Sequence, residues 1–212
     1  MKKIIALAAA IVSSVALASA EIAVGARGIF QIGVGSTISD DFKTFMTSTG
    51  ADMDSSVGFG GGFALFAHIP VAGGLAIQPE LGFTHNSIGL DIDVAGQSVD
   101  GSLSCNTLNI PILIAYDIKA GDGFTISPFV GPQIGIILGD VSFEVDGNDA
   151  GGDVDTSVLF GILVGASAAI EAGPGALVAD LRYDIGINAI KSVIDMGTPR
   201  GLQLSLGYQL QF

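Results

Sequence analysis

Residues 201–212 read GLQLSLGYQLQF, and the alternation in this stretch decides the fold. Large apolar side chains occupy every second position, with glutamine, serine or glycine between them. Side chains two residues apart lie on the same face of a β-strand, so the pattern predicts a strand with one wholly apolar face. The apolar positions are Leu202, Leu204, Leu206, Tyr208, Leu210 and Phe212.

Seven further stretches repeat this period of two, separated by segments rich in glycine, proline and aspartate. Short and long connections alternate along the chain, which predicts an all-β fold: an eight-stranded antiparallel up-and-down β-barrel. Short turns would lie at one end of it and long loops at the other. The predicted strands are 23–35, 57–69, 75–87, 103–118, 124–139, 156–171, 177–189 and 201–212; the short turns are 70–74, 119–123 and 172–176; the long loops are 36–56, 88–102, 140–155 and 190–200.

Two local features modify this pattern. Residues 40–49, DDFKTFMTST, predict a short helix in the first long loop. Proline lacks a backbone N–H, so prolines inside the strand patterns predict strand ends or bulges. These prolines are Pro79, Pro111, Pro128 and Pro132.

The composition indicates which way the apolar faces point. The chain is 49% hydrophobic and 14% charged, whereas soluble domains carry roughly 25% charged residues. The polar faces of the predicted strands hold mostly Gly, Ala, Ser, Thr, Asn and Gln, a poor coat for bulk water. Only helices and closed barrels can span a bilayer, and the period excludes helices. The sequence therefore predicts a transmembrane barrel; a soluble, lipocalin-like barrel with its apolar face inward is the alternative.

The first twenty residues, MKKIIALAAAIVSSVALASA, have the pattern of a secretory signal peptide. Lys2 and Lys3 precede the apolar stretch 4–17, and Ala18-Ser19-Ala20 supplies the small residues of a cleavage site. The apolar stretch is shorter than the roughly 20 residues of a spanning helix. Residues 1–20 are therefore predicted to direct export, and residues 21–212 to form the barrel domain.

Several strand stretches resemble a known family, the small outer-membrane β-barrel proteins akin to OmpX and the OmpA membrane domain. The resemblance extends over nearly all of residues 21–212, and it implies a multi-pass barrel in the cell outer membrane, surrounded by lipid. The end of the chain, GYQLQF, is similar to the C-terminal signal read by the family's barrel assembly machinery, which implies that role for Tyr208, Leu210 and Phe212. The stretches that carry the resemblance are LAIQPELGFTH (75–85), LNIPILIAYDI (108–118), ISPFVGPQIGIIL (126–138) and LRYDIGI (181–187).

Five charged residues occupy polar faces at similar heights above the short-turn end. The interior of an eight-stranded barrel is just wide enough for side chains to fill, and charges buried there must pair. The sequence therefore predicts a luminal charge network. It acts either as a structural plug or as part of a proton- or ion-conducting path. Its predicted members are Arg27, Glu80, Asp180, Arg182 and Asp184.

The predicted long loops are acidic, and the chain has a net charge of −13. Clustered carboxylates can bind Ca²⁺, but DGNDAGGDVD (146–155) lacks EF-hand spacing, which favours solvated anionic loops. Such a surface suits an extracellular ligand and disfavours nucleic acid. The acidic positions are Asp40, Asp41, Asp52, Asp54, Asp91, Asp93, Asp100, Asp140, Glu144, Asp146, Asp149, Asp153 and Asp155.

The sequence shows little that predicts catalysis. His68 and His85 are the only histidines, and neither has an obvious serine partner. Cys105 stands alone and is predicted to face inward as a small side chain. We expect no enzyme activity, no metal and no cofactor, and a monomer that acts as a structural or interaction platform. A narrow channel for ions or small solutes is the alternative, and a lipid-modifying enzyme is the third possibility.

Overall fold

The computed structural model describes residues 22–33, 44, 47–48, 50–94, 97–145, 148–149, 158–187 and 200–212. The predicted signal peptide, residues 1–20, lies outside this part of the chain. Of the helix predicted at 40–49, only Thr44, Thr47 and Ser48 are described, and they are helical. No helix among the described residues combines the length and the hydropathy needed to cross a membrane.

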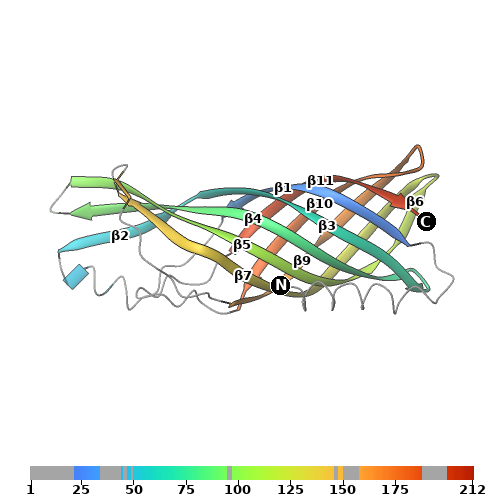
Figure 1. Cartoon of the computed structure of the whole chain (residues 1–212), viewed down its shortest axis with the longest axis horizontal. Helices are drawn as coiled ribbons and strands as arrows, with labels where there is room; N and C mark the ends of the chain where they lie inside the picture. The colour runs from blue at the N-terminus through green and yellow to red at the C-terminus, as the bar shows by residue number, and fades with distance from the viewer. Residues whose placement is uncertain are drawn as a thin grey trace.

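Eight long strands form a closed antiparallel barrel (Figure 1). Each strand pairs with its neighbours in sequence, β4 pairs with β5, and β11 pairs with β1 to complete the ring. The backbone N–H of Phe212 extends this seam by donating to the Ile22 carbonyl oxygen at 2.9 Å. The fold class predicted from the alternation is confirmed. The long strands are β1 (Ala23–Gly33), β3 (Gly58–Ala72), β4 (Leu75–Val94), β5 (Gln97–Tyr116), β7 (Phe124–Val145), β9 (Val158–Ala172), β10 (Gly175–Gly186) and β11 (Arg200–Gln211); the short ones are β2 (Ala51–Ser56), β6 (Ile118–Gly121) and β8 (Asn148–Asp149).

The three predicted short turns lie together at one end of the barrel, the turn end. Each of them contains a glycine with positive φ, a conformation that other residues rarely adopt. Gly74 has φ 88°, Gly123 has φ 69° and Gly173 has φ 64°. These residues reverse the chain within a few positions, which brings the neighbouring strands side by side.

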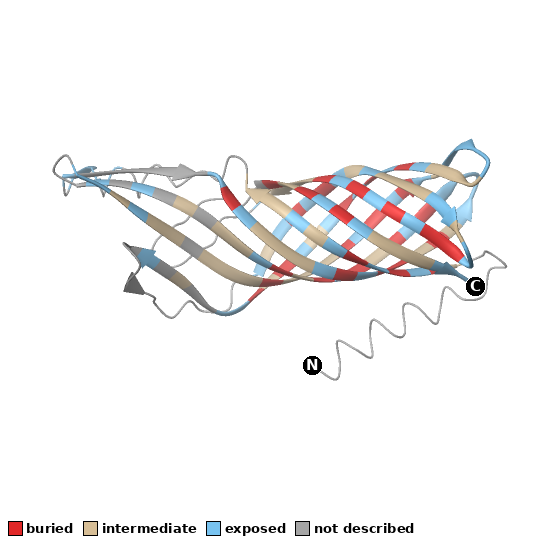
Figure 2. Ribbon diagram, turned by 90° about the horizontal axis from the view of Figure 1, so that it is seen from above, coloured by how far each residue is buried: buried red, intermediate tan, exposed pale blue. Residues whose placement is uncertain are grey.

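Apolar side chains cover the outside of the barrel, and charged side chains lie inside it. Leu206 is 73% exposed and Phe63 is 61% exposed, whereas Arg182 is 2% exposed. Buried and exposed positions alternate along the strands (Figure 2). This arrangement is the reverse of that in a soluble protein, where large apolar side chains are buried and arginine is rarely so. The alternation therefore points its apolar face outward, toward lipid.

Three strands run far beyond the barrel wall (Figure 1), and here the loop predictions were wrong. Residues 88–102 were predicted as a loop, but β4 continues to Val94 and β5 begins at Gln97. The predicted loop 140–155 likewise begins with the end of β7, which reaches Val145, and β2 occupies the end of the predicted loop 36–56. We call this projecting sheet of β2, β4, β5 and β7 the extension.

The extension forms because period-two alternation continues beyond the barrel wall. Pairing between β3 and β4 ends at Gly60 and Asn86, leaving residues 87–94 of β4 to project by about 27 Å at 3.3–3.4 Å per residue. On the outward register of β4, Leu81 and Phe83 are followed by the exposed Asp91 and Asp93. The outer face therefore changes from apolar to acidic, which marks the end of the lipid-contacting belt.

The four prolines do not end strands or produce bulges as predicted. All four lie inside long strands, and Pro79, for example, pairs with Ile112 in an unbroken register. The register shifts lie elsewhere, at Pro70/Ala72, Ser104/Asn106 and Lys119/Gly121. Each proline lacks a ladder donor, and the ladder skips two residues after Pro79 and two after Pro111 before it resumes in the same register.

Candidate functional site

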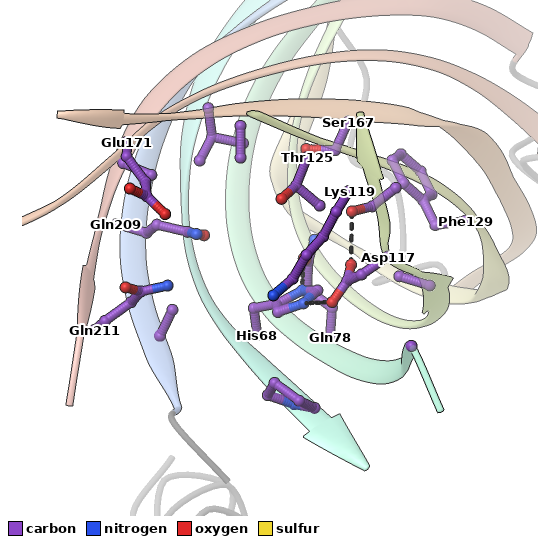
Figure 3. A pocket seen from close by; sticks show the side chains of 18 of the residues that line it. His68, Gln78, Asp117, Lys119, Thr125, Phe129, Ser167, Glu171, Gln209 and Gln211 are labelled. Atoms are coloured by element: carbon purple, nitrogen blue, oxygen red, sulfur yellow. Dashed lines mark hydrogen bonds and ion pairs between the residues drawn. The ribbon is translucent and has the colours of Figure 1, made fainter. Parts of the chain in front are cut away.

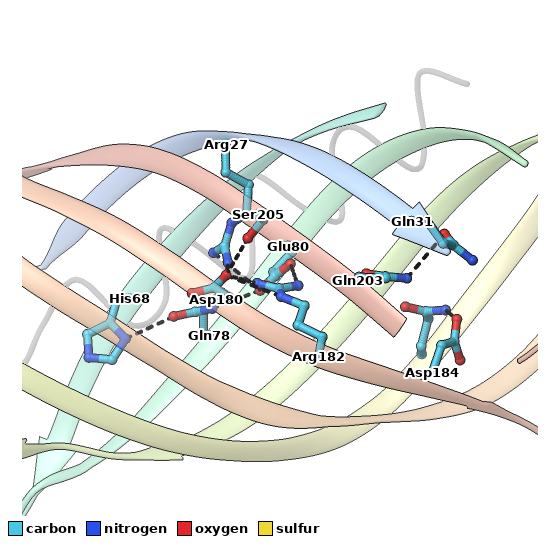
Figure 4. Close-up of polar contacts among 11 residues, drawn as sticks. Arg27, Gln31, His68, Gln78, Glu80, Asp180, Arg182, Asp184, Gln203 and Ser205 are labelled. Carbon is cyan, nitrogen blue, oxygen red and sulfur yellow. Dashed lines mark hydrogen bonds and ion pairs between the residues drawn. The ribbon is translucent and has the colours of Figure 1, made fainter. Parts of the chain in front are cut away.

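Four charged side chains from three strands meet inside the barrel (Figure 4). Arg27 on β1 and Asp180 on β10 are brought together across β11, where their register partners are Gly207 and Ser205. Glu80 on β4 reaches the same point across β3. We call Arg27, Glu80, Asp180 and Arg182 the luminal quartet.

Arg182 is the centre of the quartet. Its Nη1 donates to Glu80 Oε2 at 2.8 Å and its Nη2 donates to Glu80 Oε1 at 3.0 Å, a two-pronged contact. The same Nη2 lies 2.6 Å from Asp180 Oδ2, and Nε lies 3.2 Å from that oxygen. One guanidinium therefore bridges two carboxylates from different strands.

Arg27 completes the charge balance with fewer hydrogen bonds. Its Nη1 donates to Asp180 Oδ2, and its Nη2 lies 3.4 Å from Glu80 Oε1. Within the described part of the chain, Arg27 Nε and Nη2 have no hydrogen-bond acceptor. Two cations and two anions make the quartet neutral, and no member is more than 5% exposed. Burial of these charges is tolerated because they neutralise one another.

Neighbouring side chains hold the quartet in place. Gln78 Nε2 donates to Glu80 Oε1 at 2.7 Å, and Ser205 Oγ donates to Asp180 Oδ2 at 2.8 Å. The Arg27 guanidinium carbon lies 3.8 Å from the centre of the Phe66 ring, a cation–π distance, and Arg182 lies 5.2 Å from that of Phe129.

Inward-facing glycines provide the space for these large side chains. A Cβ on Gly207 would lie 2.7 Å from the Cβ of Arg27 and 2.3 Å from a backbone oxygen. A Cβ on Gly25 would lie 2.4 Å from the ring of Phe66. The narrow barrel therefore accommodates two arginines and an aromatic ring because the facing positions carry no side chain.

Asp184, the fifth residue predicted for the network, lies apart from the other four. Gln133 Nε2 donates to Asp184 Oδ2 at 2.8 Å, and no ion pair within the described residues includes Asp184. Arg182 directs its guanidinium toward Asp180 rather than toward Asp184, which lies two residues further along the same inward face of β10 (Figure 4). Asp184 therefore forms a separate polar layer with β7.

The three residues of the predicted assembly signal follow the outward register of β11. Leu210 is 41% exposed and Phe212 is 77% exposed, and the Tyr208 hydroxyl donates to the Ala172 carbonyl oxygen at 2.7 Å. His85 is exposed on the outside and its Nδ1 lies 3.0 Å from Asn106 Oδ1. Cys105 faces inward, 3.9 Å from the Thr107 hydroxyl.

The sequence prediction missed the uncharged members of the site. Gln78, Ser205, Phe66 and Phe129 all occupy inward positions by strand parity, but parity alone does not indicate which of them contact a charge. The described residues contain no group of three or more His, Cys, Asp or Glu side chains arranged to hold a metal ion.

The fold and the buried charges define a class: an integral β-barrel protein of the bacterial outer membrane. A family model described as outer membrane protein beta-barrel domain matches residues 19–192. The chain belongs to this family. A search of curated proteins finds no match.

Three solved structures illustrate the likeness. A major outer membrane protein from Thermus thermophilus is 16% identical, with 89% of this chain and 99% of that chain covered and a TM-score of 0.49. Neisserial surface protein A is 18% identical, with coverages of 90% and 97% and a TM-score of 0.44. Ail, the attachment invasion locus protein of Yersinia pestis, in complex with the heparin analogue sucrose octasulfate, is 13% identical, with coverages of 91% and 99% and a TM-score of 0.43.

Proposed function

We propose that this protein is a non-catalytic, monomeric platform in the outer membrane. In this proposal the barrel anchors the chain in lipid, the luminal quartet closes the lumen, and the extension presents an acidic surface outside the cell. The observation that carries the proposal is the change of polarity along β4, β5 and β7, which converts a lipid-facing surface into a charged one.

The acidic residues of the extension share one face of its sheet. Asp91 on β4 is the register partner of Asp100 on β5. Two residues further along β4, Asp93 is the register partner of Ser98. Asp91, Asp93, Asp100 and Glu144 are all exposed. Among the contacts described for this face, Ser98 Oγ donates to Asp93 Oδ1 at 2.5 Å.

Like charges directly opposite each other destabilise a strand pair. The pairing of Asp91 with Asp100 therefore lowers the stability of the extension, and this arrangement favours a role in binding. A face of this charge complements a cationic polypeptide, and electrostatic attraction would accelerate the encounter.

A narrow channel is the second candidate function. It is supported by a cavity of about 440 Å³ on the turn side of the quartet, which reaches Gln78 and Phe129. On the loop side, a cavity of only about 10 Å³ adjoins Glu80 and Arg182. Conduction along this route would require the quartet to separate, so we favour the platform.

Binding of decalysine, a cationic probe, tests the platform proposal. We expect saturable binding to the purified barrel in detergent that weakens as salt rises, because the attraction is electrostatic. The double variant Asp91→Asn/Asp93→Asn should weaken binding by about tenfold, which corresponds to roughly 1.4 kcal/mol. Titration calorimetry at two salt concentrations provides the measurement.

The matched control is Asp122→Asn, compared with the single variant Asp91→Asn, because each removes one negative charge from an exposed residue and Asp122 lies at the turn end. The Asp122→Asn variant should bind decalysine as the parent does. Equal weakening by both variants would show that net charge, rather than the acidic face of the extension, attracts the probe, and the proposal would fail.

A further inference from the structure

The barrel contains an open cavity at its turn end, which we call the turn-side cup (Figure 3). Its volume of about 440 Å³ lies within the roughly 300–1,000 Å³ of small-molecule sites, which often occupy the mouths of β-barrels. The cup exists because small residues line this layer of the barrel, whereas the next layer holds the quartet. These small residues include Ala23, Ala115, Ser127, Ser167 and Ala169.

One wall of the cup is a hydrogen-bonded chain. Ser127 Oγ donates to Asp117 Oδ1 at 2.6 Å, and Asp117 Oδ2 lies 2.9 Å from His68 Nε2. His68 Nδ1 lies 3.0 Å from Gln78 Oε1, and the amide nitrogen of Gln78 donates to Glu80. This series of hydrogen bonds therefore connects the cup to the quartet.

His68 lies between two oxygen-bearing side chains, Gln78 and Asp117. Gln78 uses its NH₂ group on Glu80, so it turns its oxygen toward His68. Both ring nitrogens of His68 then lie within hydrogen-bond distance of oxygen atoms, and a proton on each nitrogen satisfies both contacts. When it is protonated, His68 forms an ion pair with Asp117. This wall of the cup therefore offers polar contacts to a ligand.

Two charges remain at the rim of the cup: Lys119 on β6 and Glu171 on β9. Both are exposed, and no ion pair within the described residues includes either of them. Both strands pair with β7, so β6 and β9 are two strand spacings, or about 10 Å, apart. The mouth therefore carries a positive and a negative charge on two strands that flank β7.

The lining of the cup is mixed, and its apolar part comes mainly from small side chains. Ala23, Ala115, Phe129 and Val178 contribute this apolar part, beside polar residues such as Thr125. A peptide chain spans at most 3.3–3.6 Å per residue, so two or three residues match the spacing of the strands that carry Lys119 and Glu171. A ligand with only one charge would leave either Lys119 or Glu171 unmatched.

We propose that the turn-side cup binds a short peptide of two or three residues with both ends free, its carboxylate on Lys119 and its ammonium group on Glu171. Side-chain or backbone groups of the peptide would bond to the polar wall. This site lies at the opposite end of the barrel from the extension, and the inference goes beyond the platform proposal without depending on it.

Titration calorimetry with trialanine, using the purified barrel in detergent, tests this inference. We expect saturable binding with a Kd on the order of 0.1–1 mM, as suits a ligand of this size. Lys119→Gln and Glu171→Gln should each weaken binding by about tenfold or more, because each removes a charged hydrogen-bond partner. Trialanine that is acetylated at its N-terminus and amidated at its C-terminus should not bind measurably.

Asp122→Asn is the matched control. Asp122 is exposed in the turn that follows β6, does not line the cup, and carries the same charge as Glu171. This variant should bind trialanine with unchanged affinity, and circular dichroism should show the same β signal for all variants. Absence of saturable heat, equal affinity for the blocked peptide, or binding that persists in both rim variants would each overturn the inference.

Discussion

Replacing Arg182 by methionine is expected to lower the free energy of unfolding of the barrel by about 3–5 kcal/mol. The side chain is 2% exposed and contacts both carboxylates of the quartet. Its removal leaves Glu80 and Asp180 buried with Arg27 as their only cationic partner in the quartet. A urea titration of parent and variant in lipid vesicles measures the effect.

Two further variants separate the ion pair from simple loss of packing. Arg182→Lys keeps the charge but loses the two-pronged contact, so its loss of stability should be smaller. Adding Glu80→Gln to Arg182→Met restores neutrality, so the double variant should be more stable than the sum of the single effects predicts. The exposed Asp122→Asn is a surface control. Unfolding of Arg182→Met at the parent's urea concentration would contradict this account.

Deletion of Phe212 is expected to reduce the amount of protein in the outer membrane several-fold. The resemblance of the last strand to an assembly signal implies that Phe212 is read during insertion. Its side chain is 77% exposed on the outside, and its backbone N–H donates to Ile22. The refolded barrel should therefore lose only about one hydrogen bond, or about 0.5–1.5 kcal/mol.

Immunoblots of membrane fractions, together with refolding in detergent, distinguish assembly from stability. Leu206→Ala is a suitable control because Leu206 is also on the outward register of β11 and is 73% exposed. This control should reach the membrane in normal amounts. A normal membrane level of the truncated protein would refute the signal prediction.

The strands could be predicted because lipid on one side and a narrow lumen on the other enforce a period of two. The stretch 201–212 shows this clearly, since β11 spans nearly all of it with Leu204 and Leu206 exposed and Gln203 and Ser205 buried. The turns could be predicted because tight reversals need glycines such as Gly74 and Gly123.

The extension could not be predicted from hydropathy. In residues 88–94 apolar and polar side chains still alternate, but the outward positions are now polar. Asp91 and Asp93 occupy the outward register that Leu81 and Phe83 occupy earlier in β4. Acidic residues and glycine are typical of loops, yet the ladder continues because alternating β-branched and leucine residues favour strands. Charge was mistaken here for a break in the strand.

The sequence predicts which charged side chains face the lumen, but not which of them contact one another. Strand parity places Arg27, Glu80 and Arg182 inside, and an eight-stranded barrel is narrow enough that they must meet. Parity does not give the direction of a guanidinium, so Asp184 could not be separated from the quartet. Nor does it reveal that His68 contacts Asp117, because β4 lies between the strand that carries His68 and the strand that Asp117 follows.

The central claim is that the luminal quartet closes the barrel, so that the protein functions through its extension and not as a channel. Single-channel recording of the parent protein in a planar lipid bilayer tests this claim. The account predicts a membrane current that does not differ from that of the bare bilayer, because Arg182 bridges Glu80 and Asp180 across the lumen. Stable, stepwise ion conductance by the parent barrel would contradict it.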